Sequence, residues 1–306
     1  MNPFRDVIGN RHVTDALSVA IDAARQENRL PGHILLSGPA GTGKTKFSEM
    51  IAQAMEASLS RIHGPSITRR NIADLTKALI TLEDNTVLFI DEIHALPKEC
   101  MECLYEAMEQ KQVSITVPTD DGGVKIITMK LNRFVLVGAT TDPGKLTEPL
   151  RDRFNRRLTL TEYTSLELFL ILEQYQARWH EQDHGDAREI HFNAGDLQAI
   201  ADRSRGRARN ALELLSVCRD HILTGSTVEA AFAESGVGAH GQTHQDEAYI
   251  SILANVFQNG PAGIEAMVSA SGLKRETIER VIEPFLLSKG IIRRTPRGRI
   301  LIGEFR

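Results

Sequence analysis

A glycine-rich stretch at residues 38–45, which reads Gly-Pro-Ala-Gly-Thr-Gly-Lys-Thr, constrains this chain more than any other part of its sequence. It follows the apolar run of residues 34–36 and precedes a helical pattern over residues 46–55. The pattern G-x-x-x-x-G-K-[ST] between a buried strand and a helix predicts a phosphate-binding loop. Glycines let backbone N–H groups approach phosphate oxygens, and a helix N-terminus adds a partial positive charge. We therefore expect a bound nucleoside triphosphate, rather than a glycine-rich turn that arose by chance.

The end of this loop carries two side chains with distinct expected roles. The Lys44 ammonium would reach the β- and γ-phosphates of ATP, and the Thr45 hydroxyl would ligate Mg²⁺. The residues expected to bind the nucleotide here are Gly38, Pro39, Gly41, Gly43, Lys44, Thr45 and Lys46.

A second apolar run, residues 86–90, ends in Asp91 and Glu92. Alone, such a pair could be solvated acids at the end of a strand. Placed after a phosphate-binding loop, Asp91 is expected to hold Mg²⁺, usually through water, and Glu92 to orient and polarise the attacking water. The sequence therefore predicts hydrolysis as well as binding of the nucleotide.

Further strands and helices alternate around these motifs. Residues 134–139 read as a buried strand that ends at Thr140 and Thr141, and residues 112–117 and 124–129 read as an antiparallel hairpin with an acidic tip. Strand–helix alternation with polar groups at strand ends predicts an α/β fold with a parallel sheet and a site at the carboxyl ends of its strands.

The second half of the chain has mainly helical periodicity. Residues 166–179, 194–204, 209–223 and 228–234 predict four helices, followed by a Gly/His-rich linker at residues 236–245. His240 and His244 are expected to be linker residues and not metal ligands. The four arginines within residues 203–209 would be solvated, or would face phosphate as a basic loop that opens a helix.

The C-terminal segment predicts a winged helix. Helical patterns at residues 249–257, 264–270 and 275–287 precede two short strands around a basic turn within residues 291–302. From residue 289 to the end, six Lys or Arg residues stand against one acid. Because the whole chain has a net charge of −4, contact with nucleic acid is expected to be local to this patch.

Composition excludes several other classes of protein. No apolar run is long enough to span a membrane and the N-terminus lacks the layout of a signal peptide, so a cytoplasmic location is expected. Three cysteines do not form a disulfide framework, and Cys100-x-x-Cys103 is expected to lie on a packed helix because no second pair of ligands has zinc spacing.

Together these motifs resemble the AAA+ ATPases and, among them, the RuvB family of Holliday-junction branch-migration motors. The likeness spans essentially the whole chain, and its C-terminal part is the most family-specific. The resembling stretches are residues 37–45, 87–94, 104–109, 138–141, 146–154, 275–279 and 294–299.

The resemblance implies further roles for single residues. Thr141, with Thr140 as second choice, is similar to the sensor of the γ-phosphate. Arg153, in preference to Arg151, is similar to the arginine finger that completes the site of a neighbouring subunit. The remaining implied roles are nucleotide binding for Ile8 and for Arg209 of the lid, the subunit interface for Glu109, and DNA-backbone contacts for Arg294, Arg297 and Arg299.

The resemblance also implies an architecture. It is an AAA+ large ATPase domain at residues 1–160, a helical lid domain at 161–240 and a winged-helix DNA-binding domain at 241–306. A finger supplied in trans implies head-to-tail contacts and a homo-oligomeric ring, of six subunits by family expectation. The implied cofactors are ATP and Mg²⁺, and the implied partners are duplex or four-way-junction DNA and a RuvA-like protein bound through the hairpin of residues 112–129.

The chain departs from the family pattern at three places. Its N-terminus is shorter and carries Asn10 where the family has Gln, and Thr161 stands where a Tyr is usual, with Tyr163 close by. The tip of the hairpin is acidic and unlike the usual one. We therefore expect a divergent member with a partly rebuilt adenine pocket, and the acidic tip leaves the identity of the partner at the hairpin open.

Two other hypotheses stay open at this point. Clamp-loader ATPases share the pattern of residues 139–143, Ala-Thr-Thr-Asp-Pro, and would act as loaders or switches, although they lack a C-terminal winged helix. A DNA-binding regulator with a vestigial ATPase is the third hypothesis, and the occupied catalytic positions argue against it.

Overall fold

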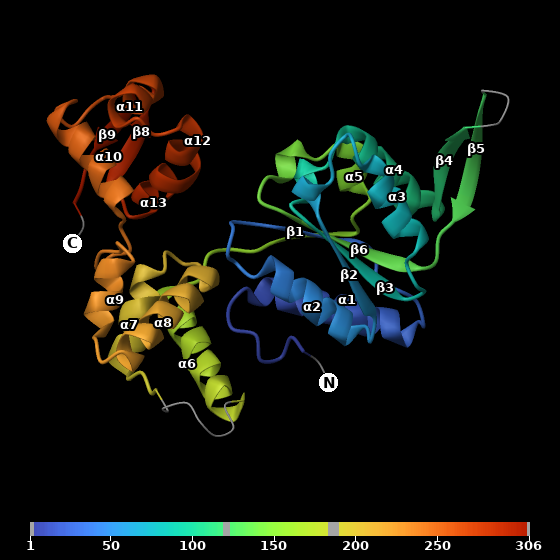
Figure 1. Cartoon of the computed structure of the whole chain (residues 1–306), viewed down its shortest axis with the longest axis horizontal. Coiled ribbons are helices and arrows are strands. Elements are labelled where there is room, and N and C mark those ends of the chain that lie inside the picture. Colours follow the sequence, from blue (N-terminus) through green and yellow to red (C-terminus); the bar gives the residue numbers. More distant parts are fainter. Residues whose placement is uncertain (1–2, 119–122, 183–189, 305–306) are drawn as a thin grey trace. The chain divides into compact units, whose positions relative to one another are not determined.

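The structure, a computed structural model, describes residues 3–118, 123–182 and 190–304. The chain packs into two compact units, residues 1–163 and 164–306 (Figure 1). The predicted limits of three domains, after residues 160 and 240, stay a prediction. Among the described residues, none of the helices is long and apolar enough to cross a membrane.

The first unit is built on a five-stranded parallel sheet in the order β2-β3-β6-β1-β7. Its central strands β3 and β6 are buried along nearly their whole length, as expected for a sheet covered on both faces. The predicted parallel α/β sheet is confirmed, although β2, β7 and helix α3 had no clear signal in the sequence. The strands are β1 Ile34–Ser37, β2 Ser58–His63, β3 Thr86–Asp91, β6 Phe134–Thr140 and β7 Arg156–Thr159.

Two hydrophobic clusters cover the two faces of this sheet. Because side chains alternate along a strand, Leu88 and Ile90 of β3 join one cluster while Val87 and Phe89 join the other. In Figure 1, α3 and α4 lie on one side of the sheet and α1 and α2 on the other. The helices of this unit are α1 Arg11–Gln26, α2 Lys44–Ala54, α3 Ile72–Ile80, α4 Lys98–Gln110 and α5 Glu148–Asp152.

The predicted hairpin is present as a separate two-stranded sheet, β4 Gln112–Pro118 with β5 Val124–Lys130. Its register pairs Gln112 with Lys130 and Pro118 with Val124. Val124 and Ile126 of β5 are exposed, at 74% and 69%. The predicted acidic tip, residues 119–122, lies outside the described residues.

The second unit begins with the four predicted helices. They are α6 Ser165–Gln182, α7 Ala194–Arg203, α8 Ala208–Leu223 and α9 Val228–Glu234. The prediction of a linker up to residue 245 was too long, because helix α10 already begins at His244 and runs to Asn255. A capping box explains the early start: Asp246 accepts hydrogen bonds from the backbone and the hydroxyl of Thr243.

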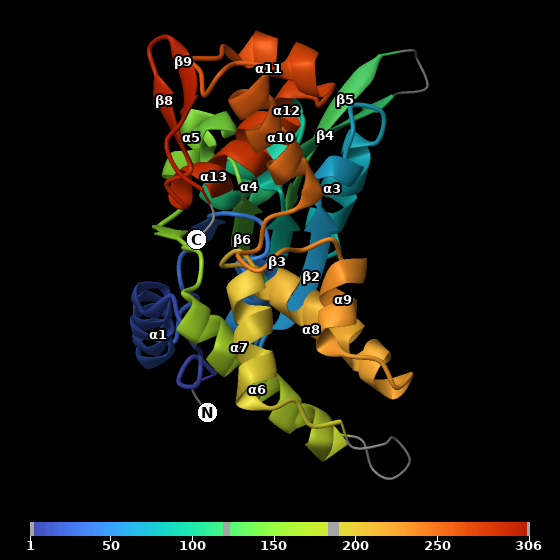
Figure 2. The ribbon, with the colours of Figure 1, turned by 90° about the vertical axis from the view of Figure 1, so that its left-hand side faces the viewer.

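The predicted winged helix is confirmed in the last part of the unit. Helix α11 Ile264–Ser271 is followed by one helical stretch composed of α12 Arg275–Thr277, a π-helical turn Ile278–Ile282 and α13 Glu283–Ser288. Pro284 explains the wide turn, because proline cannot donate the backbone hydrogen bond that would close a regular one. Strands β8 Ile292–Thr295 and β9 Gly298–Leu301 form the wing, which Figure 2 shows as a two-stranded ribbon.

Two motifs could suggest a metal, the cysteine pair of α4 and the linker histidines His240 and His244. Cys100 is buried and Cys103 half-buried on α4, as expected for a packed helix. Within the described ranges, no group of three or more His, Cys, Asp or Glu side chains is arranged to hold a metal ion.

Candidate functional site

The phosphate-binding loop joins the end of β1 to the start of α2. Gly38, Gly41 and Gly43 have φ angles of 140°, 80° and 94°, which favour glycine over any other residue. A Cβ atom on Gly38 would lie 2.4 Å from the carbonyl oxygen of Leu160, so a side chain is excluded there by contact as well. The conformation of the loop therefore requires glycine at these positions.

The Lys44 side chain is buried within this loop. Its ammonium donates to the carbonyl oxygens of Gly38 and Pro39, each at 2.8 Å. The adjacent Thr45 is half-buried at the start of α2, and Lys46 is exposed and pairs with Glu49. The sequence-predicted nucleotide-binding residues of the loop thus lie together between the end of β1 and the first turn of α2.

Three residues near the loop are those at which the sequence departs from the family pattern, Asn10, Thr161 and Tyr163. The Tyr163 hydroxyl donates to the carbonyl oxygen of Thr42 at 3.1 Å, and it lies 3.4 Å from where a Cβ on Gly43 would be. The Asn10 amide bonds the backbone of Thr161 in both directions, accepting at 2.8 Å and donating at 3.3 Å. Asn10 therefore fixes the N-terminal segment, with the half-buried Ile8, beside residues 161–163.

The acidic pair lies at the carboxyl end of β3, as predicted. Glu92 has a left-handed φ of 48°, a conformation that costs a non-glycine residue roughly 1–3 kcal/mol and recurs at functional sites. A Cβ on Gly64 would lie 2.4 Å from the Glu92 carbonyl oxygen, so this glycine permits the close approach. Asp91 accepts a hydrogen bond from the Glu92 backbone at 3.1 Å.

The Glu92 carboxylate contacts the end of the neighbouring strand β6. One oxygen, Oε2, accepts from the hydroxyl of Thr141 at 2.9 Å and from its backbone N–H at 3.2 Å. His94 Nδ1 lies 3.1 Å from the same oxygen and 2.9 Å from the Thr140 hydroxyl. The structure thus joins the predicted base, both candidate sensor residues and a histidine that sequence reasoning had not assigned.

The candidate arginine finger, Arg153, is held by two side chains of α4. Its Nη2 donates to the Tyr105 hydroxyl at 3.0 Å, its guanidinium carbon lies 4.9 Å from the Tyr105 ring centroid, and its Nη1 lies 3.0 Å from Glu109 Oε2. The hydrogen bond to Tyr105, with Glu109 nearby, holds the pKa of Arg153 above its ordinary value. Tyr105 and Glu109 are four residues apart, on one face of the helix.

Arg209, the candidate lid sensor, is the second residue of α8 and is exposed. It belongs to the second compact unit, whereas the phosphate-binding loop belongs to the first. Its role stays a prediction.

The wing arginines face a buried carboxylate. Glu283 is fully buried and accepts from Tyr249 at 3.0 Å, from Arg294 Nε at 2.8 Å and from Arg299 Nε at 2.7 Å. Burial alone would raise the pKa of Glu283, but the hydrogen bonds from Arg299 and Arg294 outweigh it and hold the pKa below its usual value. Glu283 and Tyr249 had no signal in the sequence beyond membership of helices.

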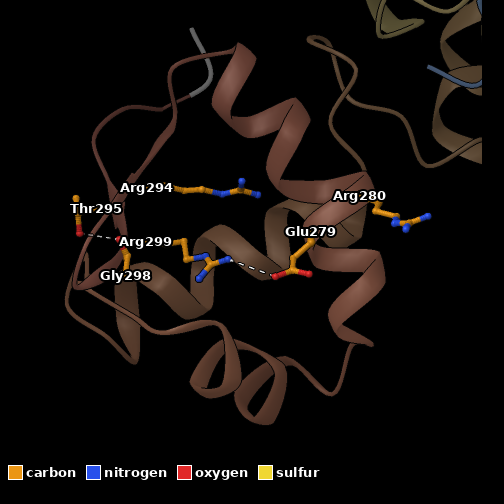
Figure 3. Close-up of a pocket in the computed structure, with 6 residues that line it drawn as sticks. All are labelled: Glu279, Arg280, Arg294, Thr295, Gly298 and Arg299. Atoms are coloured by element: carbon orange, nitrogen blue, oxygen red, sulfur yellow. Dashed lines mark hydrogen bonds and ion pairs between the residues drawn. The ribbon is translucent and has the colours of Figure 1, made fainter. Parts of the chain in front are cut away.

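Figure 3 shows the pocket between the wing and the helix that carries Glu279 and Arg280. Arg294 and Arg299 point from the wing toward this helix, and Arg299 also lies 4.0 Å from Glu279. The Arg294 side chain is 49% exposed and that of Arg299 only 14%. Arg297 lies exposed at the turn of the wing, so the three predicted DNA contacts differ in how far they can reach a ligand.

Two family models match the chain. One, described as the Holliday junction DNA helicase RuvB P-loop domain, covers residues 2–160. The other, the RuvB C-terminal winged helix domain, covers residues 239–303.

Curated relatives cover nearly the whole chain. The Holliday junction branch migration complex subunit RuvB of Nocardioides sp. is 37% identical over 302 residues, covering 96% of this chain and 81% of the relative. The protein of the same name from Acidothermus cellulolyticus is 36% identical over 304 residues, with 96% and 79% covered.

Solved structures agree with these relatives. A point mutant of Thermotoga maritima RuvB has a TM-score of 0.82 at 31% identity and covers 99% of this chain and 95% of its own. The Thermotoga maritima RuvB Holliday junction branch migration motor has a TM-score of 0.78 at 32% identity, with 96% and 92% covered.

Proposed function

Because the chain belongs to the RuvB family of Holliday junction DNA helicases, we propose that it hydrolyses ATP in a homo-oligomeric ring that moves duplex DNA and drives branch migration of four-way junctions. One observation carries this proposal. The Glu92 carboxylate is held 2.9 Å from the Thr141 hydroxyl at the ends of two adjacent strands, in a chain that also carries a winged helix. The activity serves DNA recombination and repair.

In the hydrolysis step, water attacks the γ-phosphorus, the new O–P bond forms and the bond to the β-phosphate oxygen breaks. Glu92 orients the water and accepts its proton, and Thr141 responds to the γ-phosphate through its bond to Glu92. Lys44 exchanges its loop carbonyl partners for phosphate oxygens. Asn10 supports the segment beside Ile8, where we place the adenine side of the site, and Tyr163 supports the phosphate-binding loop at Thr42.

The side chains available for a metal fit Mg²⁺. Thr45 offers a hydroxyl and Asp91 a carboxylate, which are oxygen ligands of the kind that Mg²⁺ prefers. Bound there, Mg²⁺ would neutralise charge on the phosphate oxygens.

Arg153 completes the site of the neighbouring subunit. Its guanidinium is charged, half-exposed and fixed by Tyr105 and Glu109, which limits the conformational freedom it loses on reaching a phosphate. Because each subunit would supply a finger to the next, the contacts are head-to-tail and close into a ring, which we take to be a hexamer. Glu109 lies at the same interface, and Arg209 of the lid contacts the nucleotide of its own subunit.

DNA binds at the winged helix. Arg294 and Arg297 are exposed enough to contact backbone phosphates, and Arg299 supports them from its largely buried position against Glu283. The hairpin β4–β5, with Val124 and Ile126 exposed, is the proposed contact for a RuvA-like protein. Action on four-way-junction DNA agrees with a cytoplasmic location, which is part of this proposal.

The winged helix and the branch-migration relatives favour a motor over the loader or switch hypothesis. The test measures ATP hydrolysis without DNA, with linear duplex and with a four-way junction, alongside strand displacement from the junction. We expect junction-dependent displacement that Lys44→Ala and Glu92→Gln abolish, while Glu102→Gln on the exposed face of α4 serves as a matched control. Hydrolysis that no DNA alters, without displacement, would instead support a loader.

A further inference from the structure

The arginine-rich segment of residues 203–209 is not simply solvated. Two of its guanidinium groups stack on aromatic rings: that of Arg203 lies 4.1 Å from the Phe232 centroid and that of Arg205 lies 4.0 Å from the Phe285 centroid. Phe232 belongs to α9 of the helical bundle, whereas Phe285 belongs to α13 of the winged helix. The two similar contacts therefore differ in what they connect.

Arg205 makes two further contacts with the winged-helix side. Its Nε donates to the Gly241 carbonyl oxygen at 2.6 Å, and its Nη2 pairs with the Asp246 carboxylate. The Arg205 side chain is 11% exposed and that of Asp246 is fully buried. Burial lowers the pKa of Arg205 and the Asp246 charge opposes this, and Arg205 stays charged at neutral pH because guanidinium is not deprotonated in proteins.

The Asp246 carboxylate has two functions in this contact. It closes the first turn of α10 by accepting from the Thr243 backbone at 2.7 Å and from its hydroxyl at 2.8 Å. The same oxygen, Oδ2, is the partner of Arg205. The start of the first winged-helix helix is therefore bonded directly to the helical bundle.

The linker between the two parts is packed against the same segment. Gly241 has a φ of 83°, and a Cβ there would lie 2.9 Å from the Arg203 carbonyl oxygen and 3.3 Å from Arg205 Cγ. The backbone N–H of Gly238 donates to the Gln242 carbonyl oxygen at 2.8 Å, which closes the linker into a tight turn. The linker is thus folded onto the arginine segment instead of being an extended tether.

We propose that Arg205 is a coupling residue, which fastens the helical bundle to the winged helix so that both move as one body when the nucleotide changes. This inference rests on the proposed ATP-driven function. Arg205 lies four residues before the candidate lid sensor Arg209, and its stacking partner Phe285 lies two residues after Glu283, which holds the wing arginines. Through these contacts, a displacement of the helical bundle moves the DNA-binding wing with it.

The variants must avoid leaving a buried charge without its partner. Arg205→Met alone would leave the buried Asp246 carboxylate without its ion partner. The double variant Arg205→Met/Asp246→Asn removes both charges, keeps similar volumes and leaves an amide oxygen that can still cap α10. The matched control is Arg203→Met, which removes the same kind of aromatic contact from the same segment but leaves the contact with the winged helix intact.

The first measurement is a distance distribution between spin labels at Glu229→Cys of α9 and Ser269→Cys of α11, both exposed positions, with the three native cysteines replaced by alanine. The distribution should broaden in Arg205→Met/Asp246→Asn and stay narrow in Arg203→Met. An unchanged distribution in the double variant overturns the proposal. This readout needs no ATPase activity, so it is separate from failure of the proposed function.

The second measurement is the extent of branch migration per ATP hydrolysed by the full-length chain. The double variant should keep its ATP hydrolysis without DNA within about twofold while migration per ATP falls at least about fivefold, the lower end of a typical coupling free energy. Arg203→Met should keep both values. A broadened distance distribution with undiminished migration per ATP would show that the contact does not couple the two parts, and would also overturn the proposal.

Discussion

The nucleotide site and the wing both depend on charged side chains, but they hold them in different ways. In the nucleotide site, strand ends and left-handed backbone positions place Glu92 and the loop glycines, and the partners are mostly backbone or neutral groups. In the wing, one fully buried carboxylate holds two arginines. The first arrangement leaves charge available for a ligand. In the second, much of the arginine charge is neutralised by the buried carboxylate and stabilises the fold.

The largest effect should come from the candidate finger. Arg153→Ala should lower ATP hydrolysis about 10³-fold, because a finger stabilises charge in the transition state. A mixture of Arg153→Ala and Glu92→Gln subunits should regain activity, since one supplies the base and the other the finger at a shared interface.

Arg151→Ala, four positions into the short helix α5, is the control and should retain most activity. If the mixture of Arg153→Ala and Glu92→Gln stays as inactive as each variant alone, Arg153 does not act in trans.

The buried carboxylate that holds the wing arginines, Glu283, should matter chiefly for stability. Glu283→Gln should destabilise the protein by about 2–3 kcal/mol, below the 3–5 kcal/mol typical of a broken buried pair because Arg294 can turn to solvent. Urea unfolding followed by circular dichroism measures this. Glu304→Gln, exposed at the end of the chain, serves as the control.

The same carboxylate predicts a pH dependence. The folded-state pKa of Glu283 is held below its unfolded value. The contribution of this carboxylate to the free energy of unfolding is therefore complete above about pH 4.3 and is lost as the pH falls through the folded-state pKa. The loss of stability in acid should therefore be shallower in Glu283→Gln. Parallel acid titrations of the two proteins would contradict the pairing.

The exposed wing arginine, Arg297, can be compared with the largely buried Arg299 of the same wing. Arg297→Ala should weaken duplex binding and reduce the slope of log affinity against log salt by about 1, as expected for one phosphate contact. Arg299→Met should weaken binding with a smaller change in slope, because its charge is already paired. Equal slopes for the two variants would show that both contact phosphate directly.

The smallest effect concerns the support of the finger. Tyr105→Phe keeps the ring but removes the hydroxyl bonded to Arg153, and should lower hydrolysis about fivefold, the value of one hydrogen bond. In an Arg153→Ala background the same change should have no further effect. An additional loss in that background would show that Tyr105 acts by another route.

Motifs with local chemistry could be predicted from the sequence. The phosphate-binding loop, the acidic strand end and the wing each place their key residues within a few positions, so their patterns were readable. Support from distant residues could not be predicted in the same way. The contact of Asn10 with Thr161, the contact of Arg153 with Tyr105 and the burial of Glu283 join segments far apart in sequence.

The sequence does not predict secondary structure where the side chains of an element are only partly buried. Strand β2 has an intermediate or exposed side chain at every position, and β7 alternates over only four residues, so neither carries a strong apolar pattern. The sequence does not predict the early start of α10, because its capping box begins at Thr243 within the Gly/His-rich stretch and is completed by Asp246 just after it.

The π-helical turn at residues 278–282 amounts to one extra residue inserted into a helix. Each residue of a regular helix turns the chain by about 100°, and the wider turn absorbs the extra residue, so Glu283 and Phe285 keep their buried positions. A second residue inserted here would have no such turn to absorb it and would rotate both side chains away together, and with them the anchor of the wing arginines and the ring on which Arg205 stacks. An insertion of one residue is therefore the simplest single mutation that would release both the wing and Arg205.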